Sequence, residues 1–501
     1  MDILSGLQTG FAAVLQPSML LYCFAGVFIG TLVGVLPGLG PVGAMSLLLP
    51  PTIGLSPAAS IIMLAGIFYG AMYGGSTTSI LVNIPGEAAS VVTCLDGYQM
   101  ARRGRAGPAL GMSALGSFVG GTFSVVALMV LVFPLAEFAL KFGPPEYFAL
   151  ICLSMTVLSY LTSGARSKAL LMVLLGLILG TVGIDSVSGM PRFCFGSAFL
   201  LDGVGLIPVA MGLFGISEVL VNLESPEERS ILNERITNLF PTLDDWKRSA
   251  APIARGSVLG FLLGILPGAG AVMASFLSYA VEKRLSKRPE EFGKGAIEGV
   301  AGPETANNAA SGAAFVPLLA LGIPPNIVMG LLMGALVLHG VTPGPLLLTQ
   351  HPEIFWGVIA SMYLGNVMLV ILNLPLVGMW VRVLRVPYKF LMPMILLCCL
   401  IGVYGASENP ADIWVMVASG AAGYVLRRFG YELAPLVLAL VLGPLLETNF
   451  RNSLTLSDGS FAIFVTRPIP AVVLGVSAVL VLTMLHPKTA KRSRLAVGSI
   501  E

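Results

Sequence analysis

One fifteen-residue pattern occurs twice in this chain. It reads GVFIGTLVGVLPGLG over residues 26–40 and GSVLGFLLGILPGAG over residues 256–270. In both copies, glycines four residues apart lead into Leu-Pro-Gly and one further glycine. Glycines at this spacing let membrane helices approach closely, and a Pro-Gly pair interrupts a helix. Because a broken helix survives at membrane depth only inside protein or beside a watery cavity, two equivalent breaks indicate the binding site of a secondary transporter.

Apolar segments long enough to span a bilayer recur along the whole chain. Of the 501 residues 56% are hydrophobic and only 11% are charged, whereas soluble proteins carry about 25% charged residues. We therefore predict an all-α polytopic membrane protein, with about 10–12 transmembrane helices and additional broken or re-entrant helices. The predicted spans lie near residues 17–36, 57–73, 109–133, 145–162, 168–183, 204–221, 313–338, 355–381, 389–405, 412–426, 433–447 and 469–486.

The charges of the loops predict that the two halves have opposite orientations. The loop after the first Pro-Gly break (residues 50–54) has no Lys or Arg, whereas the loop after the second (residues 283–288) is basic. Each half also has a second break, Asn83-Ile84-Pro85-Gly86 in one and Gly322-Ile323-Pro324-Pro325 in the other. The first is followed by basic residues 102–105 and the second by a loop without Lys or Arg, residues 339–352. Since basic loops stay in the cytoplasm, we expect two inverted-topology repeats.

This scheme divides the chain into four parts. Residues 1–221 form the first repeat half and residues 222–254 a polar cytoplasmic connector. Residues 255–486 form the second repeat half with additional helices, and residues 487–501 form a cytoplasmic tail. The N-terminus is expected outside and the C-terminus in the cytoplasm.

Two polar runs lie beside the second breaks and are the predicted binding surfaces. They are GGSTTS (residues 74–79) and GPETANNAASG (residues 302–312). Neither run contains Lys or Arg, so a bound anion would be held by helix N-termini and by hydroxyl and amide donors. Oxygen atoms of unwound backbone and of Asn would suit a hard cation such as Na⁺. Four carboxylates border the runs and are candidates for ion or proton binding: Glu87, Asp96, Glu298 and Glu304.

Other classes of function find less support in the sequence. The match to G-x-G-x-x-G at residues 38–43 follows a membrane helix rather than a strand, and no P-loop sequence occurs. The three histidines are scattered, the six cysteines include no C-x-x-C pair, and no basic tract indicates nucleic-acid binding. No enzymatic activity and no resident cofactor are expected. A membrane enzyme acting on a lipid-linked substrate and a passive anion channel stay as the alternatives.

The motifs together resemble one known family. The chain is similar to the large membrane subunit of the bacterial tripartite tricarboxylate transporters. The resemblance covers essentially all of the chain and rests on GVLPGLGP (34–41), YGGSTTSILVNIPGEAASVVTCLDGYQMARRGRAG (73–107), GILPGAGAVMASFLSY (264–279), GPETANNAASGAAFVPLLALGIP (302–324) and HGVTPGP (339–345).

The resemblance implies a permease that works with two partners. These are a small membrane subunit of four helices and a periplasmic solute-binding protein. It also implies symport with Na⁺, or with H⁺, of a di- or tricarboxylate such as citrate. The residues expected to bind substrate are Ser76, Thr77, Thr78, Asn83, Pro85, Gly86, Glu304, Thr305, Asn307, Asn308, Ser311, Gly322 and Pro324. Those expected near the cations are Gly38, Gly40, Gly268, Gly270, Asn83 and Asn307.

The two second breaks differ in one respect. Pro325-Asn326 in the second half stands where the first half has Gly86-Glu87. Because proline has no N–H group, the second break cannot present the same array of backbone amides, which bears on the size and charge of the substrate.

Overall fold

A computed structural model describes residues 3–36, 40–161, 165–185, 188–224, 238–268, 270–384, 386 and 388–485. The first half consists of α1 (Ile3–Val14), α2 (Pro17–Val35), α3 (Gly40–Thr52), α4 (Pro57–Val82), η1 (Ala88–Ser90), α5 (Val91–Thr93), η2 (Cys94–Tyr98), η3 (Ala101–Arg105), α6 (Ala106–Ala139), α7 (Pro144–Leu161), α8 (Arg166–Gly180), β1 (Gly183–Ile184), β2 (Pro191–Arg192), η4 (Ala198–Asp202), α9 (Leu206–Ala210), η5 (Met211–Ile216) and α10 (Ser217–Glu224).

The second half begins with α11. It consists of α11 (Leu243–Ile265), α12 (Gly270–Leu285), η6 (Pro289–Glu291), α13 (Glu298–Ala313), α14 (Phe315–Leu321), α15 (Ile327–Leu338), α16 (Leu347–Gln350), α17 (Pro352–Asn373), α18 (Val377–Leu384), α19 (Tyr388–Ser407), α20 (Pro410–Arg428), α21 (Ala434–Leu456), α22 (Ile463–Thr466) and α23 (Pro468–Leu485).

The helices have the lengths and apolar composition of membrane spans. Seven helical segments in the described part of the chain are long and apolar enough to cross a bilayer, and three further apolar helices are shorter. The predicted all-α polytopic membrane protein is confirmed. The predicted span 313–338 is two helices, α14 and α15, separated by the second break.

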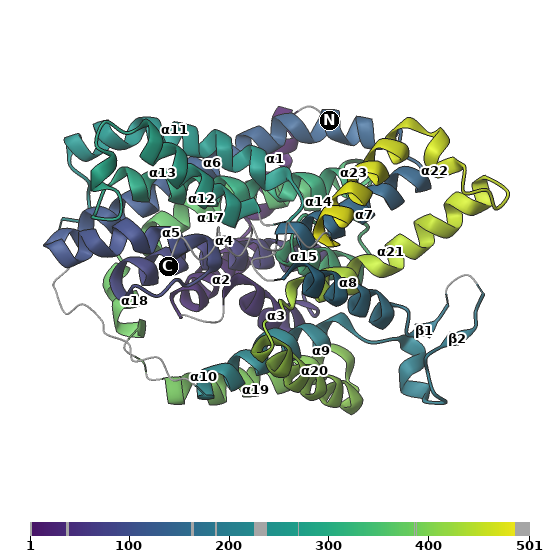
Figure 1. The fold of residues 1–501 in the computed structure, drawn as a ribbon. Coiled ribbons are helices and arrows are strands. Elements are labelled where there is room, and N and C mark those ends of the chain that lie inside the picture. Colours follow the sequence, from purple (N-terminus) through teal and green to yellow (C-terminus); the bar gives the residue numbers. More distant parts are fainter. Residues whose placement is uncertain are drawn as a thin grey trace.

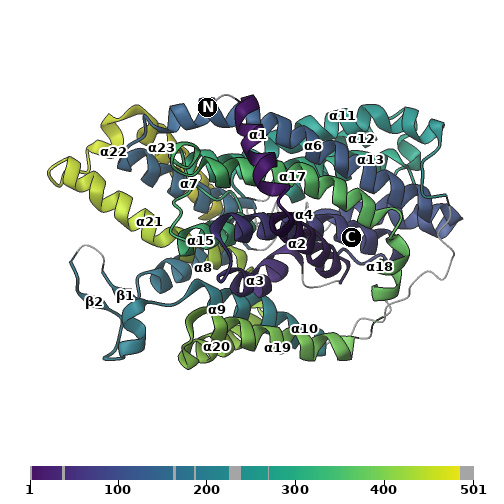
Figure 2. The same ribbon diagram turned by 180° about the vertical axis from the view of Figure 1, so that it is seen from behind.

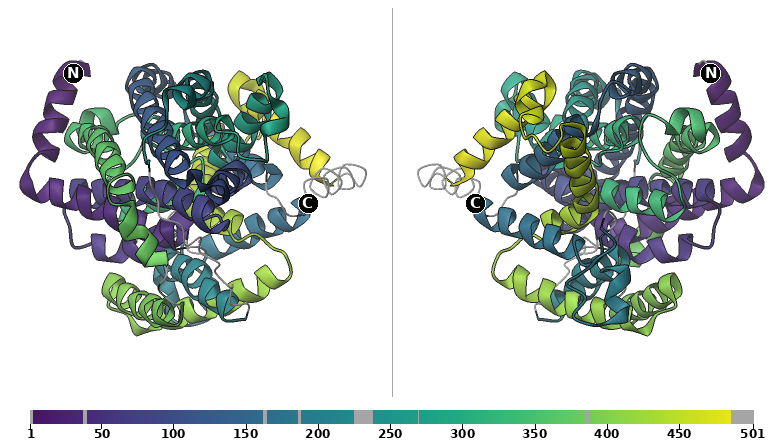
Figure 3. Two further views of the ribbon diagram at one scale, coloured as in Figure 1. Left: turned by 90° about the vertical axis from the view of Figure 1, so that its left-hand side faces the viewer. Right: turned by 90° about the vertical axis from the view of Figure 1, so that its right-hand side faces the viewer.

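The helices separate into groups along the molecule. Figures 1 and 2 show α11, α12 and α13 together at one end and α21, α22 and α23 at the other. Helices α19 and α20 lie side by side along one edge, where α20 packs on η5 and α9. The hairpin of β1 and β2 projects at the end that carries α21, to which Arg192 is joined by an ion pair with Glu447. Figure 3 shows α1 and α23 on different sides of the molecule.

The repeated glycines form two equivalent helix pairs. A Cβ atom on Gly30 of α2 would lie 2.3 Å from the carbonyl oxygen of Ile67 in α4, and one on Gly260 of α11 would lie 2.2 Å from that of Ala306 in α13. The glycines one turn before and after make the same approach in each pair. Each of these contacts is therefore a backbone contact that only glycine allows.

The second breaks also have matching backbone geometry. Helix α4 ends at Asn83 and α14 ends at Gly322, and both residues are left-handed, with φ of 61° and 69°. Four residues later, Glu87 and Asn326 are extended and cap the next helix with their side chains. The positions thus correspond residue by residue, although their side chains differ. We call residues 83–87 tip 1 and residues 322–326 tip 2.

The equivalent helices α4 and α13 run in opposite directions. Ser76 of α4 contacts Glu304 of α13. Further along α4, Ile80 lies against Gly97, which also lies beside Val300 of α13. Residue numbers therefore rise along α4 while they fall along α13. This is the arrangement expected of inverted repeats.

The two polar runs lie outside the predicted spans, yet both are helical in the structure. Residues 74–79 are a regular part of α4, and residues 302–312 are a regular part of α13. Non-helical backbone follows each of these helical segments at the tips, residues 83–87 and 322–326. Helix α11 begins at Leu243, inside the range assigned to the connector. Residues 225–237 of that connector and the predicted tail, residues 487–501, lie outside the described residues.

Candidate functional site

A buried carboxylate lies where the two halves meet. Glu304 projects from α13 and is 1% exposed. Its Oε2 atom accepts a hydrogen bond from the Ser76 hydroxyl at 2.6 Å, and its Oε1 atom accepts one from the hydroxyl of Thr93. The Ser117 hydroxyl also donates to Oε2, at 3.5 Å. These donors come from α4, α5 and α6, so a single side chain of the second half is held by three helices of the first.

Asn308 extends this hydrogen-bonded group. Its Nδ2 atom donates to the Ser117 hydroxyl at 2.7 Å and to the carbonyl oxygen of Glu304 at 3.1 Å. Asn308 is buried and lies one helical turn after Glu304. The amide therefore orients one of the hydroxyls that bind the carboxylate.

A second buried carboxylate lies at tip 1. Glu87 caps η1 by accepting a hydrogen bond from the backbone N–H of Ala89. Its Oε1 atom accepts a hydrogen bond from Nδ2 of Asn307, on α13, at 3.3 Å. The Oδ1 atom of Asn307 is buried and has no hydrogen-bond partner in the part of the chain that the structure describes. Glu87 and Asn307 thus form a second contact between the two halves, with one acceptor unused.

Each tip rests on the first break of its own half. The N–H of Gly86 donates to the carbonyl oxygen of Gly75 at 3.4 Å, and a Cβ on Gly86 would lie 2.4 Å from the carbonyl oxygen of Gly34. In the second half, the N–H of Gly268 donates to the carbonyl oxygen of Pro325 at 2.7 Å. Each tip therefore packs against described residues that flank the first break of its half, and we call these residues with the tip the break-and-tip unit.

The two tips differ in exposure. The Asn83 side chain of tip 1 is exposed, whereas Ile323, Pro324 and Pro325 of tip 2 are buried. A Cβ on Gly322 would lie 2.6 Å from the carbonyl oxygen of Pro343, so the loop after α15 packs closely on tip 2. Of the two tips, tip 1 offers the more accessible polar side chain.

The structure brings some of the predicted binding residues together and separates others. Ser76, Glu304 and Asn308 form one group, and Asn307 joins Glu87. The remaining hydroxyls bond to backbone carbonyls: Thr78 to Val35 at the end of α2, and Thr305 and Ser311 to the preceding turn of α13. Thr77 is buried, and Pro85 and Gly86 form tip 1. Of the predicted cation residues, Gly40 and Gly270 begin α3 and α12, Gly268 contacts tip 2, and Gly38 lies outside the described residues.

Sequence reasoning missed two of the hydroxyls around Glu304. Thr93 lies in a short helix after tip 1, and Ser117 lies in the middle of the long helix α6. Neither residue belongs to a polar run or to a repeated motif, so no local pattern marks them. Their role follows only from the way α5 and α6 pack against α13.

Asp96 joins the halves at the start of α13. This buried carboxylate accepts hydrogen bonds from the N–H groups of Gly295 and Ala296, at 2.7 and 2.8 Å, and from the Tyr279 hydroxyl at 3.0 Å. A Cβ on Gly299 would lie 2.2 Å from Oδ2 of Asp96. Asp96 therefore secures the segment after tip 1 to the N-terminal end of α13.

Ion pairs connect the predicted cytoplasmic loops to one another, so these loops lie on the same side of the two repeats. Arg105 pairs with Asp245 at 2.6 Å, and Arg248 pairs with Glu291 at 2.6 Å and Glu298 at 2.8 Å. Arg288 also pairs with Glu291. The two basic loops used to assign the orientation and the predicted connector therefore lie together, as one common side of the membrane requires.

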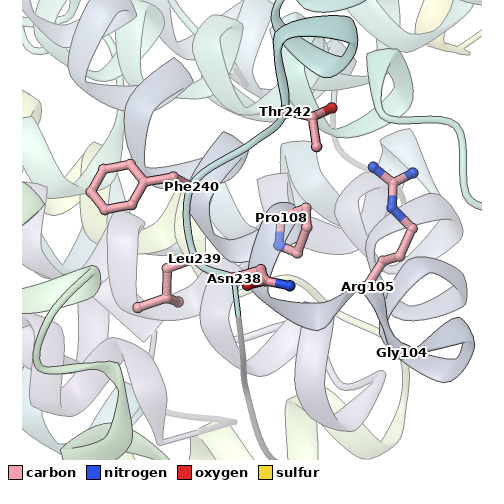
Figure 4. Close-up of a pocket in the computed structure, with 7 residues that line it drawn as sticks. All are labelled: Gly104, Arg105, Pro108, Asn238, Leu239, Phe240 and Thr242. Atoms are coloured by element: carbon pink, nitrogen blue, oxygen red, sulfur yellow. The ribbon is translucent and has the colours of Figure 1, made fainter.

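A pocket of about 520 Å³ lies on this side, beside Arg105. Figure 4 shows its lining residues, which come from η3, the first turn of α6 and the segment before α11: Gly104, Arg105, Pro108, Asn238, Leu239, Phe240 and Thr242. None of the predicted binding residues lines it. The pocket belongs to the join between the halves and not to the buried carboxylates.

The described residues hold few groups for other chemistry. They contain no group of three or more His, Cys, Asp or Glu residues that could hold a metal ion. In the part of the chain that the structure describes, no salt bridge joins Glu87 or Glu304 to a basic side chain. The buried site thus consists of carboxylate, hydroxyl and amide groups.

Comparison with known proteins places the chain in one family. An uncharacterized 52.8 kDa protein of Agrobacterium vitis, encoded in the TAR-I ttuC' 3' region, is 51% identical over 498 residues, which cover 99% of both chains. An uncharacterized protein from the TAR-II ttuC' 3' region of the same organism is 54% identical over 239 residues, covering 48% of this chain and 99% of that protein. No solved structure matches. The model of the tripartite tricarboxylate transporter TctA family matches residues 20–438, and the chain belongs to this family.

Proposed function

We propose that this chain is the large permease subunit of a three-component importer that moves a di- or tricarboxylate, such as citrate, in symport with Na⁺. The observation that carries the proposal is the break-and-tip unit that occurs once in each half, in opposite orientations, with Glu304 buried between the halves. Opposed repeats around a central site allow alternating access when one repeat moves against the other. The family supports the transport of carboxylates by a tripartite system.

The substrate would be held at tip 1 and at the start of α3. Helix α3 begins at Gly40, directly after the first break, and Gly40 lies close to Gly86 of tip 1. The N-terminus of a helix carries a partial positive charge and free N–H groups, which suit a carboxylate. The exposed amide of Asn83 adds a directed donor. Because Glu304 and Glu87 are themselves negative when ionised, we place the substrate carboxylates at the Asn83 amide and the N-terminus of α3, away from both side chains.

Two partners complete the transporter that we propose. A periplasmic solute-binding protein would deliver the carboxylate, and a small membrane subunit of four helices would associate with this chain in the inner membrane. The membrane faces follow from the basic residues near Arg105, Arg248 and Arg288, which we assign to the cytoplasm.

The test is uptake of labelled di- and tricarboxylates into proteoliposomes that contain this chain and the small subunit. The binding protein is added outside, and the Na⁺ gradient is present or collapsed. We expect uptake that needs both the gradient and the binding protein. Uptake without a gradient would indicate a passive channel, and conversion of the substrate would indicate a membrane enzyme; either result contradicts the proposal.

A substitution that adds a negative charge at tip 1 tests whether the substrate binds there. Asn83→Asp keeps the size of the side chain, and Asp tolerates the left-handed backbone as Asn does. A negative charge beside a bound carboxylate is unfavourable, so we expect uptake to fall about tenfold or more. The matched control is Asn449→Asp on α21, which should transport normally. Equal uptake by both variants would remove tip 1 from the substrate site.

A further inference from the structure

We infer that Glu87, Asn307 and Glu304 bind the cation that drives transport, and that this cation is Na⁺. The inference rests on the proposed function, since it names the coupling-ion site of that transporter. The two buried groups adjoin, because a Cβ on Gly75 would lie 2.9 Å from Cγ of Glu87 and the next residue, Ser76, donates to Glu304. We call Glu87, Asn307 and Glu304 the buried cluster. Three of its features carry the inference: its charge, its unused acceptor and its position between the halves.

The cluster carries negative charge without a basic side chain to balance it. Glu87 and Glu304 are 8% and 1% exposed, and neither forms a salt bridge within the described residues. An ionised carboxylate removed from water is unfavourable unless a charge of opposite sign accompanies it. Hydroxyl donors orient Glu304 but bring no positive charge. The cluster therefore needs a cation when its carboxylates are ionised.

Asn307 provides an independent indication of a bound ion. The side chain is 1% exposed, and its Oδ1 atom has no hydrogen-bond partner among the described residues. The nitrogen of the same carboxamide donates to Oε1 of Glu87 at 3.3 Å, so the carboxamide that carries the unused oxygen adjoins that carboxylate. Buried acceptors are nearly always paired with a donor or with an ion. Asn307 would thus contribute a neutral oxygen ligand next to the Glu87 carboxylate.

The number and type of ligands favour a monovalent ion. Carboxylate, amide and hydroxyl oxygens are ligands for hard cations rather than for transition metals. Hydrogen bonds already occupy much of the acceptor capacity: three hydroxyls donate to Glu304, and Ala89 and Asn307 donate to Glu87. With about four acceptor sites on each carboxylate and two on the Asn307 oxygen, about five sites remain for coordination, whereas Ca²⁺ takes six to eight oxygen ligands. One Na⁺ fits this supply better than a divalent ion, and the charge balances when one of the two carboxyl groups is ionised and the other is protonated.

The position of the cluster would link ion binding to the conformation. Glu87 belongs to tip 1 in the first half, and Asn307 and Glu304 belong to α13 in the second. An ion held by both halves stabilises the arrangement in which they are in contact. Its loss leaves uncompensated charge at that contact and shifts the population towards other arrangements. Binding of the ion at this place is therefore coupled to the relative position of the repeats.

The experiment measures Na⁺ binding without substrate and without a gradient. This chain with its small subunit is placed in lipid nanodiscs, and thermal unfolding is followed while NaCl replaces choline chloride at constant ionic strength and pH. We expect the unfolding midpoint to rise with Na⁺ and to stay constant when KCl replaces choline chloride. Glu304→Gln and Glu87→Gln should raise the half-saturating Na⁺ concentration at least tenfold. The control Glu137→Gln, which changes an exposed carboxylate near the end of α6, should behave as the unmodified chain.

Three outcomes would overturn the inference. The first is an unchanged half-saturating Na⁺ concentration in both variants of the cluster. The second is stabilisation by acidification alone, which would make the cluster a proton carrier, and the third is no response to Na⁺ in the unmodified chain. If Glu304→Gln does not fold, Asn307→Ala provides the test, because it removes an uncharged ligand and should raise the half-saturating concentration several-fold.

The result is distinguishable from a failure of the proposed function. If uptake is driven by Na⁺ but Na⁺ binding is unchanged in the variants, the proposed transport function holds and the proposed cation site is rejected. Na⁺ binding that depends on Glu304, without any uptake of carboxylates, would keep the site and reject the proposed substrates.

Discussion

The Ser76 hydroxyl donates a 2.6 Å hydrogen bond to Oε2 of Glu304, and this bond joins α4 of the first half to α13 of the second. The two helices occupy equivalent places in the repeat and run in opposite directions. A buried carboxylate at this crossing is therefore held by residues that no local stretch of sequence brings together. The contact connects the inverted architecture with the chemistry of the site.

The close glycine contacts between α2 and α4 and between α11 and α13 predict how substitutions there change the stability of the protein. Gly30→Ala and Gly260→Ala both place a Cβ within 2.3 Å of a carbonyl oxygen on the facing helix. The helices must separate, and we expect each substitution to destabilise the protein by about 1–3 kcal/mol. Thermal unfolding in nanodiscs measures the effect.

A glycine without close neighbours provides the matched control. No atom would lie within 4 Å of a Cβ on Gly475 in α23. Gly475→Ala should therefore be neutral or slightly stabilising, because alanine favours the helix. Equal destabilisation by Gly475→Ala and Gly260→Ala would contradict the close backbone contact between α11 and α13.

The hydrogen bonds of Asp96 predict how much the contact between the segment after tip 1 and the start of α13 contributes to stability. Asp96→Asn replaces a carboxylate oxygen by an NH₂ group, which faces the N–H donors of Gly295 and Ala296 or the Tyr279 hydroxyl. The amide can keep Oδ1 towards the two N–H groups and donate from Nδ2 to the Tyr279 hydroxyl, so the variant loses the charge on the acceptor, which lowers the unfolding free energy by about 1–2 kcal/mol. Tyr279→Phe should cost less, because it removes one hydrogen bond and leaves the backbone contacts intact.

A double-mutant cycle separates this contact from general damage. The effects of Asp96→Asn and Tyr279→Phe should be non-additive, since the two side chains share a hydrogen bond. The control Asp202→Asn, at an exposed position after η4, should be close to neutral. Additive effects of the first pair would show that the bond contributes nothing.

Glu291 makes a prediction for the pH dependence of stability. The hydrogen bond from Arg248 lowers the pKa of the Glu291 carboxyl below its ordinary value of 4.5. A lowered pKa in the folded state means that the ionised form stabilises the fold above the ordinary pKa, and that this contribution disappears as the pH falls through the folded-state value. Glu291→Gln should therefore lower the unfolding midpoint at pH 7, with a difference that shrinks below pH 4.5.

The effect of Glu291 should be small, because the side chain is 36% exposed. The neighbouring exposed Glu290 supplies the control. Glu290→Gln should leave the midpoint nearly unchanged at both pH values. A difference between Glu291→Gln and the unmodified chain that grows on acidification would contradict the assigned ion pair.

Much of the architecture could be predicted from the sequence, because membrane helices have characteristic hydropathy and glycine spacing. The repeated glycines of residues 26–40 and 256–270 predict close helix pairs, and the structure contains both pairs. The match between Asn83-Ile84-Pro85 and Gly322-Ile323-Pro324 is confirmed by the shared left-handed residue at each helix end. Hydropathy also located most of the long spans, since lipid-facing helices are apolar over their full length.

The site was less readable, because its contacts depend on the crossing of distant helices. Ser76, Asn307 and Glu304 stand out as polar residues in apolar surroundings, but their helical state was missed. Small polar residues are poor helix formers in isolation, yet packing keeps the polar runs of α4 and α13 helical. Thr93 and Ser117 carry no local signal at all. The roles in binding that we assign to these residues remain predictions.

The central claim is that the two halves have opposite orientations in the membrane. It is tested most directly by labelling single cysteines in the loops that follow the two first breaks, with Gly54→Cys and Lys287→Cys; both positions are exposed. A membrane-impermeant maleimide is added to right-side-out and to inside-out vesicles, and the unmodified chain gives the background from its six native cysteines. We predict that Gly54→Cys is labelled in right-side-out vesicles and Lys287→Cys only in inside-out vesicles. Labelling of both cysteines from the same side would contradict the inverted repeat.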